Sequence, residues 1–148
     1  MTKKLLRVCH AIVRFDNIPH DVTSNVLERT KLPLYGDILE WEYCFRRNIT
    51  MLQFETKLQT DLNVRIGDEI LRLCKLGHYP TLHLDFNFSG ASYFRFQISN
   101  DTLRKLSRDS RSIELSYPSL VFSNQLSIAV SSNLIKILNQ YRFSLEIV

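Results

Sequence analysis

Histidines, cysteines and acidic residues are the side chains of this chain that could bind a metal or perform catalysis. The 148 residues include four histidines, of which His78 and His83 are five positions apart. Metal ligands on one helix face are three or four apart, and ligands on one strand face are two apart. His83 and Asp85 share a face of a predicted strand, opposite its apolar residues, so we expect both to face solvent. We therefore expect neither a metal site nor a cofactor.

The three cysteines, Cys9, Cys44 and Cys74, are far apart in the sequence. No Cys-x-x-Cys pair occurs, which argues against a zinc ribbon, and an odd number argues against a disulfide framework. We expect three buried thiols.

No arrangement typical of an enzyme is found. The chain has no Gly-x-Ser-x-Gly nucleophile motif, and its four glycines are too scattered for a phosphate-binding loop. The carboxylates of Glu40 and Glu42 lie in a context typical of a protein surface. We expect a protein that is not an enzyme and has no small-molecule substrate.

Basic residues give a stronger indication of function. The formal net charge is +4, which is compatible with an anionic partner. Three basic groups could neutralise the phosphates of RNA or of an anionic membrane: Lys3, Lys4 and Arg7; Arg46 and Arg47; and Arg104, Lys105, Arg108 and Arg111. The alternative for residues 104–111 is a solvated helix face, partly balanced by Asp101 and Asp109.

The tetrapeptide Tyr-Pro-x-Leu occurs twice, at 79–82 and 117–120. Budding enveloped viruses use this tetrapeptide to recruit an adaptor of the host membrane-scission machinery, and such a signal must be exposed and extended. Leu82 belongs to an apolar alternation, so Pro80 more simply marks the start of a strand. The second copy, Tyr117, Pro118 and Leu120, stays a candidate peptide signal if Tyr117 is exposed.

The bulk composition predicts one globular domain, 1–148. Hydrophobic residues make up 45% of the chain and charged residues 23%, which suffices for a core. The apolar runs are too short to span a membrane. The N-terminal segment is broken by His10 and Arg14, and we read it as mature structure rather than a signal peptide.

The elements that would position these residues can be read from periodicity and capping. In the first half we expect a strand at 5–15, a helix at 22–31 and a helix at 38–47, although an alternating pattern at 38–47 also fits a strand. Residues 49–58 stay open. A helix at 69–76 would be capped by Asp68 and ended by Gly77.

The second half contains more strand patterns. Residues 81–88 and 93–99 form a predicted hairpin with a turn at 89–92, and Phe86, Phe88, Phe94 and Phe96 are expected in the core. Helices are expected at 102–108, capped by Asn100 or Asp101, and at 132–141, capped by Ser132 or Asn133. Strands are expected at 112–116, 120–130 and 142–148. The pattern predicts an α+β fold, a largely antiparallel sheet built from hairpins with three to five short helices packed on it.

The order of a strand at 5–15, a helix at 22–31 and a hairpin at 82–98 resembles the globular domain of rhabdovirus matrix proteins. The resemblance concerns the arrangement over most of the chain. It implies a non-enzymatic viral assembly protein that self-associates and binds nucleocapsid and anionic membrane. The three basic groups would carry the last two contacts.

Two other functions remain open. One is a viral RNA-binding accessory protein that antagonises silencing or innate immunity, and the other is a module that binds a host protein. We expect a homo-oligomer in the host cytoplasm, at a membrane or in the virion, neither secreted nor transmembrane.

Overall fold

The computed structural model describes residues 3–5, 7–19, 34–35, 38–86, 96–118 and 125–147. Of residues 3–5, 34–35, 65, 116–118 and 125–126 it describes the backbone alone. The strands are β1 (Lys3–Leu5), β2 (Val8–Phe15), β3 (Leu34–Tyr35), β4 (Ile38–Ile49), β5 (Thr81–Asp85), β6 (Phe96–Ile98), β7 (Ile113–Pro118), β8 (Gln125–Val130) and β9 (Ser144–Ile147). The helices are α2 (Met51–Asp61), the π-helical turn η1 (Leu62–Ile66), α3 (Gly67–Lys75), α4 (Asn100–Arg108) and α5 (Ser132–Gln140). The predicted helix at 22–31 lies outside the described residues.

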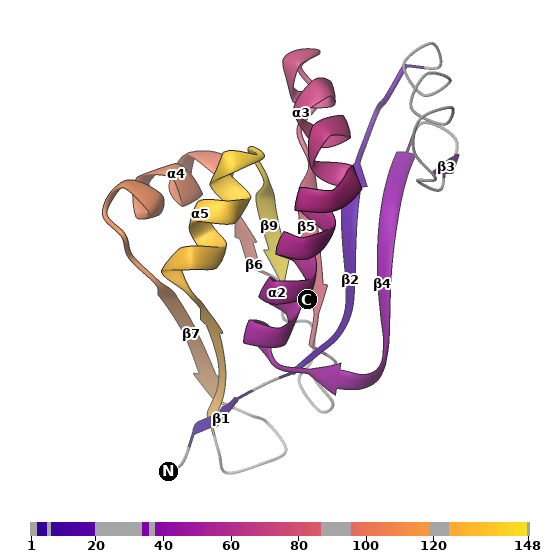
Figure 1. Cartoon of the computed structure of the whole chain (residues 1–148). Coiled ribbons are helices and arrows are strands. Elements are labelled where there is room, and N and C mark those ends of the chain that lie inside the picture. The colour runs from indigo at the N-terminus through magenta and orange to yellow at the C-terminus, as the bar shows by residue number, and fades with distance from the viewer. Residues whose placement is uncertain are drawn as a thin grey trace.

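The strands form a mostly antiparallel six-stranded sheet and a mixed three-stranded sheet, so the fold is α+β, as predicted (Figure 1). One sheet has the order β3-β4-β2-β5-β9-β6, and the other has the order β1-β8-β7. Each sheet contains one parallel pair, β5 with β9 and β1 with β8.

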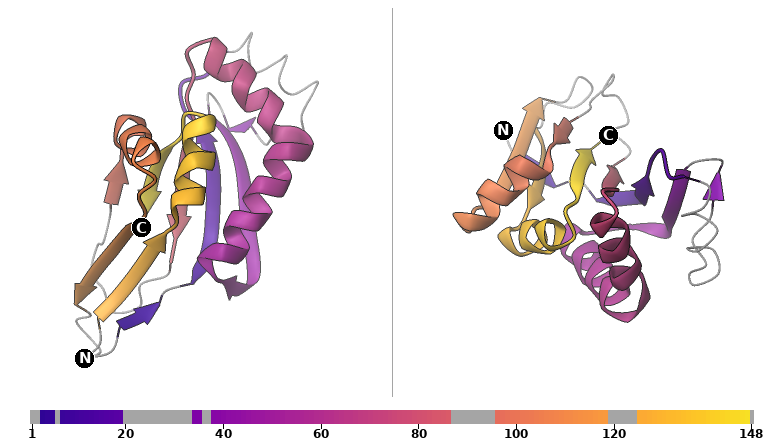
Figure 2. Two further views of the ribbon diagram at one scale, coloured as in Figure 1. Left: turned by 60° about the vertical axis from the view of Figure 1, so that its left-hand side comes forward. Right: turned by 90° about the horizontal axis from the view of Figure 1, so that it is seen from above.

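The six-stranded sheet has one covered face and one open face. Alternate residues of β2, such as Ala11, Val13 and Phe15, are buried beneath the helices. Figure 2 shows the helices gathered on this side of the strands. The β2 residues that alternate with this buried row, such as His10 and Arg14, are only half-buried. This second face is called the outer face below.

The expected helix at 38–47 is wrong, because these residues belong to the 12-residue strand β4. β4 pairs with β2 from Phe15–Leu39 to His10–Cys44. Up to Phe45 its odd-numbered residues face the core, where Tyr43 contacts Phe54 edge to face with 5.8 Å between ring centroids. The period-two pattern prevailed because pairing with β2 places this row against the core, with Leu39 and Tyr43 buried and the others partly buried. Residues 49–58, for which the sequence favoured neither a helix nor a strand, contain the end of β4 and the start of α2.

β4 leaves its regular pairing with β2 near its end. The register passes from His10–Cys44 to Val8–Ile49, so five steps along β4 match two along β2. Residues 45–48 therefore form a bulge, which sets their side chains outside the regular alternation. Arg46, Arg47 and Asn48 are all exposed there.

The helix after β4 continues through a π-helical turn into α3. Thr50 caps α2 in a capping box with Gln53. The predicted cap at Asp68 is wrong, since α3 follows η1 directly and Asp68 lies within it. At the junction the Gly67 N–H donates to the Leu62 carbonyl, five residues back.

The helix ends follow a common pattern. α3, α4 and α5 end in Schellman-type turns with a positive φ at Gly77, Ser110 and Arg142, respectively. The predicted end at Gly77 is confirmed. The N-caps are Ser99 for α4 and Ser131 for α5, so neither of the two caps expected for each helix is correct.

A buried carboxylate ties α2 to α5. Glu55 is 6% exposed, and it accepts a hydrogen bond from Ser131 Oγ at 2.8 Å and another from Asn133 Nδ2. Ser131 Oγ in turn accepts from the Leu134 N–H. The negative charge therefore lies at the N-terminus of α5, where the helix dipole favours it.

The predicted hairpin at 82–98 is wrong, because β9 lies between β5 and β6. Leu82, Leu84 and Phe86 are buried as expected, and Phe96 is half-buried. Phe88 and Phe94 lie outside the described residues. The predicted strand at 112–116 overlaps β7, and those at 120–130 and 142–148 contain β8 and β9. No helix among the described residues is long and apolar enough to cross a membrane.

Candidate functional site

The predicted basic groups lie at two separate ends of the molecule (Figure 1). The start of β2 and the end of β4 meet at one end, where Val8 pairs with Ile49. Arg7 precedes Val8 directly, so it lies at the same end as the bulge that carries Arg46 and Arg47, on the other side of the Val8–Ile49 pair. All three arginines are exposed. We call these three residues the basic end. Helix α4 lies at the other end and packs on α5.

The 104–111 group is partly neutralised by acidic residues of α4 and of the turn that follows it. Arg104 forms an ion pair with Asp101, and Arg111 Nε lies 3.8 Å from Asp109 Oδ2. Lys105 and Arg108 are exposed. At the basic end, in contrast, Arg46 and Arg47 form no ion pair with another described residue. Lys3 and Lys4 lie on β1, but the directions of their side chains are not described.

The two Tyr-Pro-x-Leu segments have different positions. Tyr79 is half-exposed, Pro80 is buried directly before β5, and Leu82 is fully buried. A partner could not read this copy as a free peptide, which confirms that Pro80 introduces a strand. In the second copy, Tyr117 and Pro118 end β7 rather than begin a strand. Leu120 lies outside the described residues, and of Tyr117 only the backbone is described. The second signal therefore stays a prediction.

A polar cleft of about 400 Å³ lies where α4, the end of α5 and the start of β9 meet, beside Tyr79. Arg142, which has a φ of 56°, lies over the Tyr79 ring with 5.6 Å from Cζ to the ring centroid. Asp101 also lines the cleft and already pairs with Arg104. The guanidinium groups of the cleft thus have partners within the protein, so it is a weaker candidate site.

The outer face of the six-stranded sheet carries most of the histidine and acidic side chains of its strands. It presents His10 and Arg14 from β2, Glu40 and Glu42 from β4, His83 and Asp85 from β5, and Glu146 from β9. His83 and Asp85 were expected on the face opposite the apolar residues of their strand. Both lie on the outer face, where they are half-buried. His83 Nδ1 lies 3.4 Å from Glu146 Oε1.

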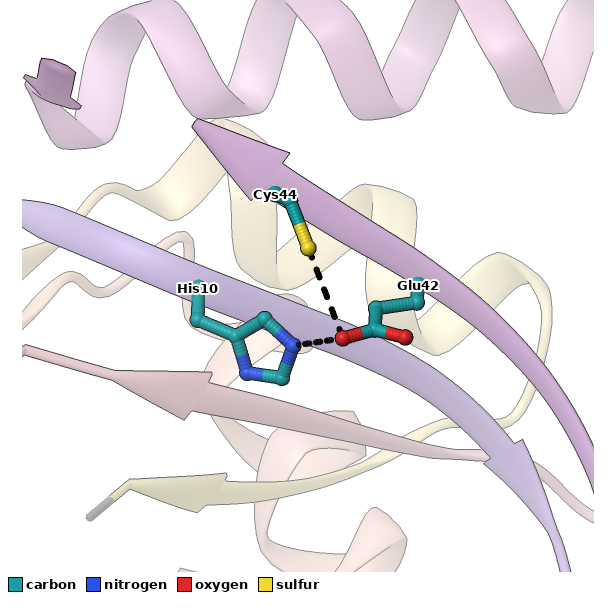
Figure 3. A group of neighbouring side chains, drawn as sticks. All are labelled: His10, Glu42 and Cys44. Carbon is teal, nitrogen blue, oxygen red and sulfur yellow. Dashed lines mark hydrogen bonds and ion pairs between the residues drawn. The ribbon is translucent and has the colours of Figure 1, made fainter. Parts of the chain in front are cut away.

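Three side chains of the outer face converge, as Figure 3 shows. His10 comes from β2, and Glu42 and Cys44 come from β4. His10 Nε2 lies 2.7 Å from Glu42 Oε1, and Cys44 Sγ donates to the same oxygen at 3.4 Å. Their ligand atoms all lie within 4.8 Å of one another.

The electrostatics of this trio depend on the shared carboxylate. Hydrogen bonds from His10 and Cys44 lower the pKa of Glu42. The hydrogen bond that Cys44 donates to Glu42 raises the pKa of the Cys44 thiol. Both shifts follow from the same bonds, which favour an ionised carboxylate beside a protonated thiol.

Sequence spacing did not predict this trio. His10 and Cys44 are 34 positions apart, and only the β2–β4 register places them opposite each other. The spacing Glu42-x-Cys44 was the sequence signal that could have suggested part of the trio, because residues two apart share a strand face. The prediction of three buried thiols is wrong for Cys44, which is exposed, and Cys9 and Cys74 are half-buried.

Comparisons with protein-family models, with curated proteins and with solved structures gave no match for this chain.

Proposed function

We propose that this protein is a non-enzymatic assembly protein of the viral matrix type, which binds an anionic surface and associates with copies of itself. The observation that carries the proposal is the basic end. Arg46 and Arg47 project from a bulge, without an ion pair to a described residue, at the same end of the sheet as the exposed Arg7. Bulges re-aim side chains without breaking the sheet, so a rigid strand presents the two guanidinium groups.

Arginine suits phosphate because its planar guanidinium can donate two parallel hydrogen bonds. Both nucleocapsid RNA and anionic lipid headgroups offer phosphate oxygens to such a group. The bulge holds two arginines on consecutive residues, so both can contact one curved or flat anionic surface. We place the protein in the host cytoplasm, at a membrane or in the virion.

Self-association is supported by the exposed side of the long helix. Leu52 is 70% exposed and Val64 is 69% exposed. Thr56 and Thr60 lie between them at a spacing of four, and each hydroxyl donates to the carbonyl four residues earlier. These hydroxyls therefore satisfy their donors within the helix. The four residues, named the helix stripe, carry no charge and can pack against a second copy.

The proposal is tested by measuring binding to phosphatidylserine vesicles and to RNA at several salt concentrations. We expect the double variant Arg46→Glu with Arg47→Glu to lose at least about tenfold in affinity, since each cation near an anionic membrane contributes about 1 kcal/mol. The salt dependence should also become shallower.

The matched control is Lys105→Glu with Arg108→Glu, which changes the net charge equally at the far end of the molecule. The proposal expects this variant to keep most of its binding. Equal losses in both variants would indicate a net-charge effect without a site. Binding to double-stranded RNA alone, with no binding to vesicles, would instead favour the RNA-binding accessory protein.

A further inference from the structure

The trio of His10, Glu42 and Cys44 contains one nitrogen, one oxygen and one sulfur donor. In a tetrahedral zinc site with bonds of about 2.0–2.3 Å, neighbouring ligand atoms lie about 3.3–3.8 Å apart. The separations here include 2.7 Å for His10 Nε2 to Glu42 Oε1 and 3.4 Å for Cys44 Sγ to the same oxygen. Since none exceeds 4.8 Å, small side-chain rotations would reach zinc geometry.

The backbone that carries these donors is held by regular pairing. His10 lies opposite Cys44, and Ile12 lies opposite Glu42, two steps apart in the same antiparallel ladder. β2 is also paired on its other side, where His10 lies opposite Asp85 of β5. Ligands on interior strands are positioned more accurately than ligands on loops. The trio therefore needs no backbone rearrangement to converge.

The site is also accessible. The His10 side chain is 27% exposed and the Glu42 side chain is 49% exposed, and Cys44 is exposed as well. A metal ion could enter from the outer face and keep one coordination position for water. Among the described residues, this is the one group of three histidine, cysteine or acidic side chains whose donors lie so close together.

We propose that His10 Nε2, a Glu42 carboxylate oxygen and Cys44 Sγ form a binding site for Zn²⁺, with water as the fourth ligand. Thiolate and imidazole favour zinc over magnesium and calcium, which prefer oxygen ligands. On binding, the Cys44 thiol releases its proton to solvent and coordinates as the thiolate. The metal would link β2 to β4 on the outer face. This inference is independent of the anion-binding proposal.

The test is a titration of the reduced full chain with Co²⁺, followed by absorption spectroscopy. Cobalt adopts zinc geometry, and a cobalt–thiolate bond gives a charge-transfer band in the near ultraviolet. We expect one Co²⁺ per chain, displaced by Zn²⁺. Cys44→Ser should abolish the band, and His10→Asn or Glu42→Gln should weaken metal binding by at least about tenfold.

Two variants serve as matched controls. His83→Asn removes a histidine that lies near Glu146 on the same face, and Cys74→Ser removes another thiol. Both should leave the band unchanged. The melting temperature of the wild type should rise with Zn²⁺, whereas that of Cys44→Ser should not.

The metal-free melting temperature of each variant shows whether it folds. A missing band in the wild type, or a band that persists in Cys44→Ser, would overturn the proposal. A band lost equally in His83→Asn and in His10→Asn would also overturn it, because the donors would then not be those of the trio.

Discussion

At the scale of single residues, Tyr43 shows how a core accommodates one polar atom. Its ring is buried, and its hydroxyl donates to Asp61 Oδ2 at 2.7 Å. Burial and the hydrogen bond to Asp61 both raise the pKa of Tyr43 well above its ordinary value of 10.0. The bond links β4 to the end of α2, so an inward-facing strand residue also fixes the helix above it.

This environment predicts a loss of stability in alkali. The unfolded chain ionises Tyr43 near pH 10, whereas the folded protein keeps the proton, so folding is favoured below pH 10 and weakened above it. The free energy of unfolding should fall by about 1.4 kcal/mol per pH unit for this group. Urea denaturation of the wild type and of Tyr43→Phe, at pH 7 and at several values above 10, isolates the contribution.

Other groups with raised pKa values also lower the stability in alkali, equally in the wild type and in Tyr43→Phe. Burial and the nearby Asp85 raise the pKa of Cys9 to about 11, and burial raises that of Tyr141. Their contributions cancel in the comparison. Tyr43→Phe should be less stable at pH 7 by about 1 kcal/mol because it lacks one hydrogen bond. Parallel stability curves above pH 10 would contradict the assigned role of Tyr43.

At the scale of elements, the helix from Met51 to Lys75 is shaped by its π-helical turn. A Cβ added at Gly67 would lie 2.2 Å from the Leu62 carbonyl oxygen and 2.9 Å from the Tyr141 hydroxyl oxygen. The glycine is required for this close approach and not for its backbone angles, since its φ is −61°. The turn thus allows the helix to pack against the end of α5.

We expect Gly67→Ala to lower the free energy of unfolding by about 1–3 kcal/mol, the range for an overpacked core. In an ordinary helix the same change would stabilise by roughly 0.5–1 kcal/mol, so even the sign is informative. Asn63→Ala, at an exposed position of the same turn, is the control and should change stability little. Urea denaturation measures both, and a stabilised Gly67→Ala would contradict the packing argument.

At the scale of the whole molecule, the helices cover one face of the six-stranded sheet and leave two surfaces available to partners. The first is the outer face, which carries the proposed zinc site. The second is the helix stripe of Leu52, Thr56, Thr60 and Val64, on the side of the helix that faces away from the core. The basic end lies beside the start of this helix, because β4 leads through Thr50 into α2.

The helix stripe predicts the state of association. The mass of the wild type in sedimentation equilibrium should increase with concentration, and Leu52→Glu with Val64→Glu should remain monomeric because a charged stripe would have to be desolvated. Gln97→Glu with Thr102→Glu adds the same charge at exposed positions of β6 and α4, away from the stripe, and should still associate. A wild type that is monomeric at all concentrations would contradict this role of the stripe.

The sequence alone determined the features that depend on neighbouring residues. Alternation in residues 82–86 predicted their buried row, Gly77 predicted the end of α3, and the mixture of patterns predicted the α+β class. These features arise from local backbone preferences and from the alternation of buried and exposed residues within one element. Both can be read from neighbouring residues in the sequence.

Only the tertiary structure decided which strands pair. It made residues 38–49 a strand, because pairing with β2 places the odd-numbered side chains up to Phe45 against the core. It inserted β9 between β5 and β6, and it brought His10 to Glu42 and Cys44. Such contacts join residues far apart in the sequence, and their energy comes from burial and register, which no local pattern specifies.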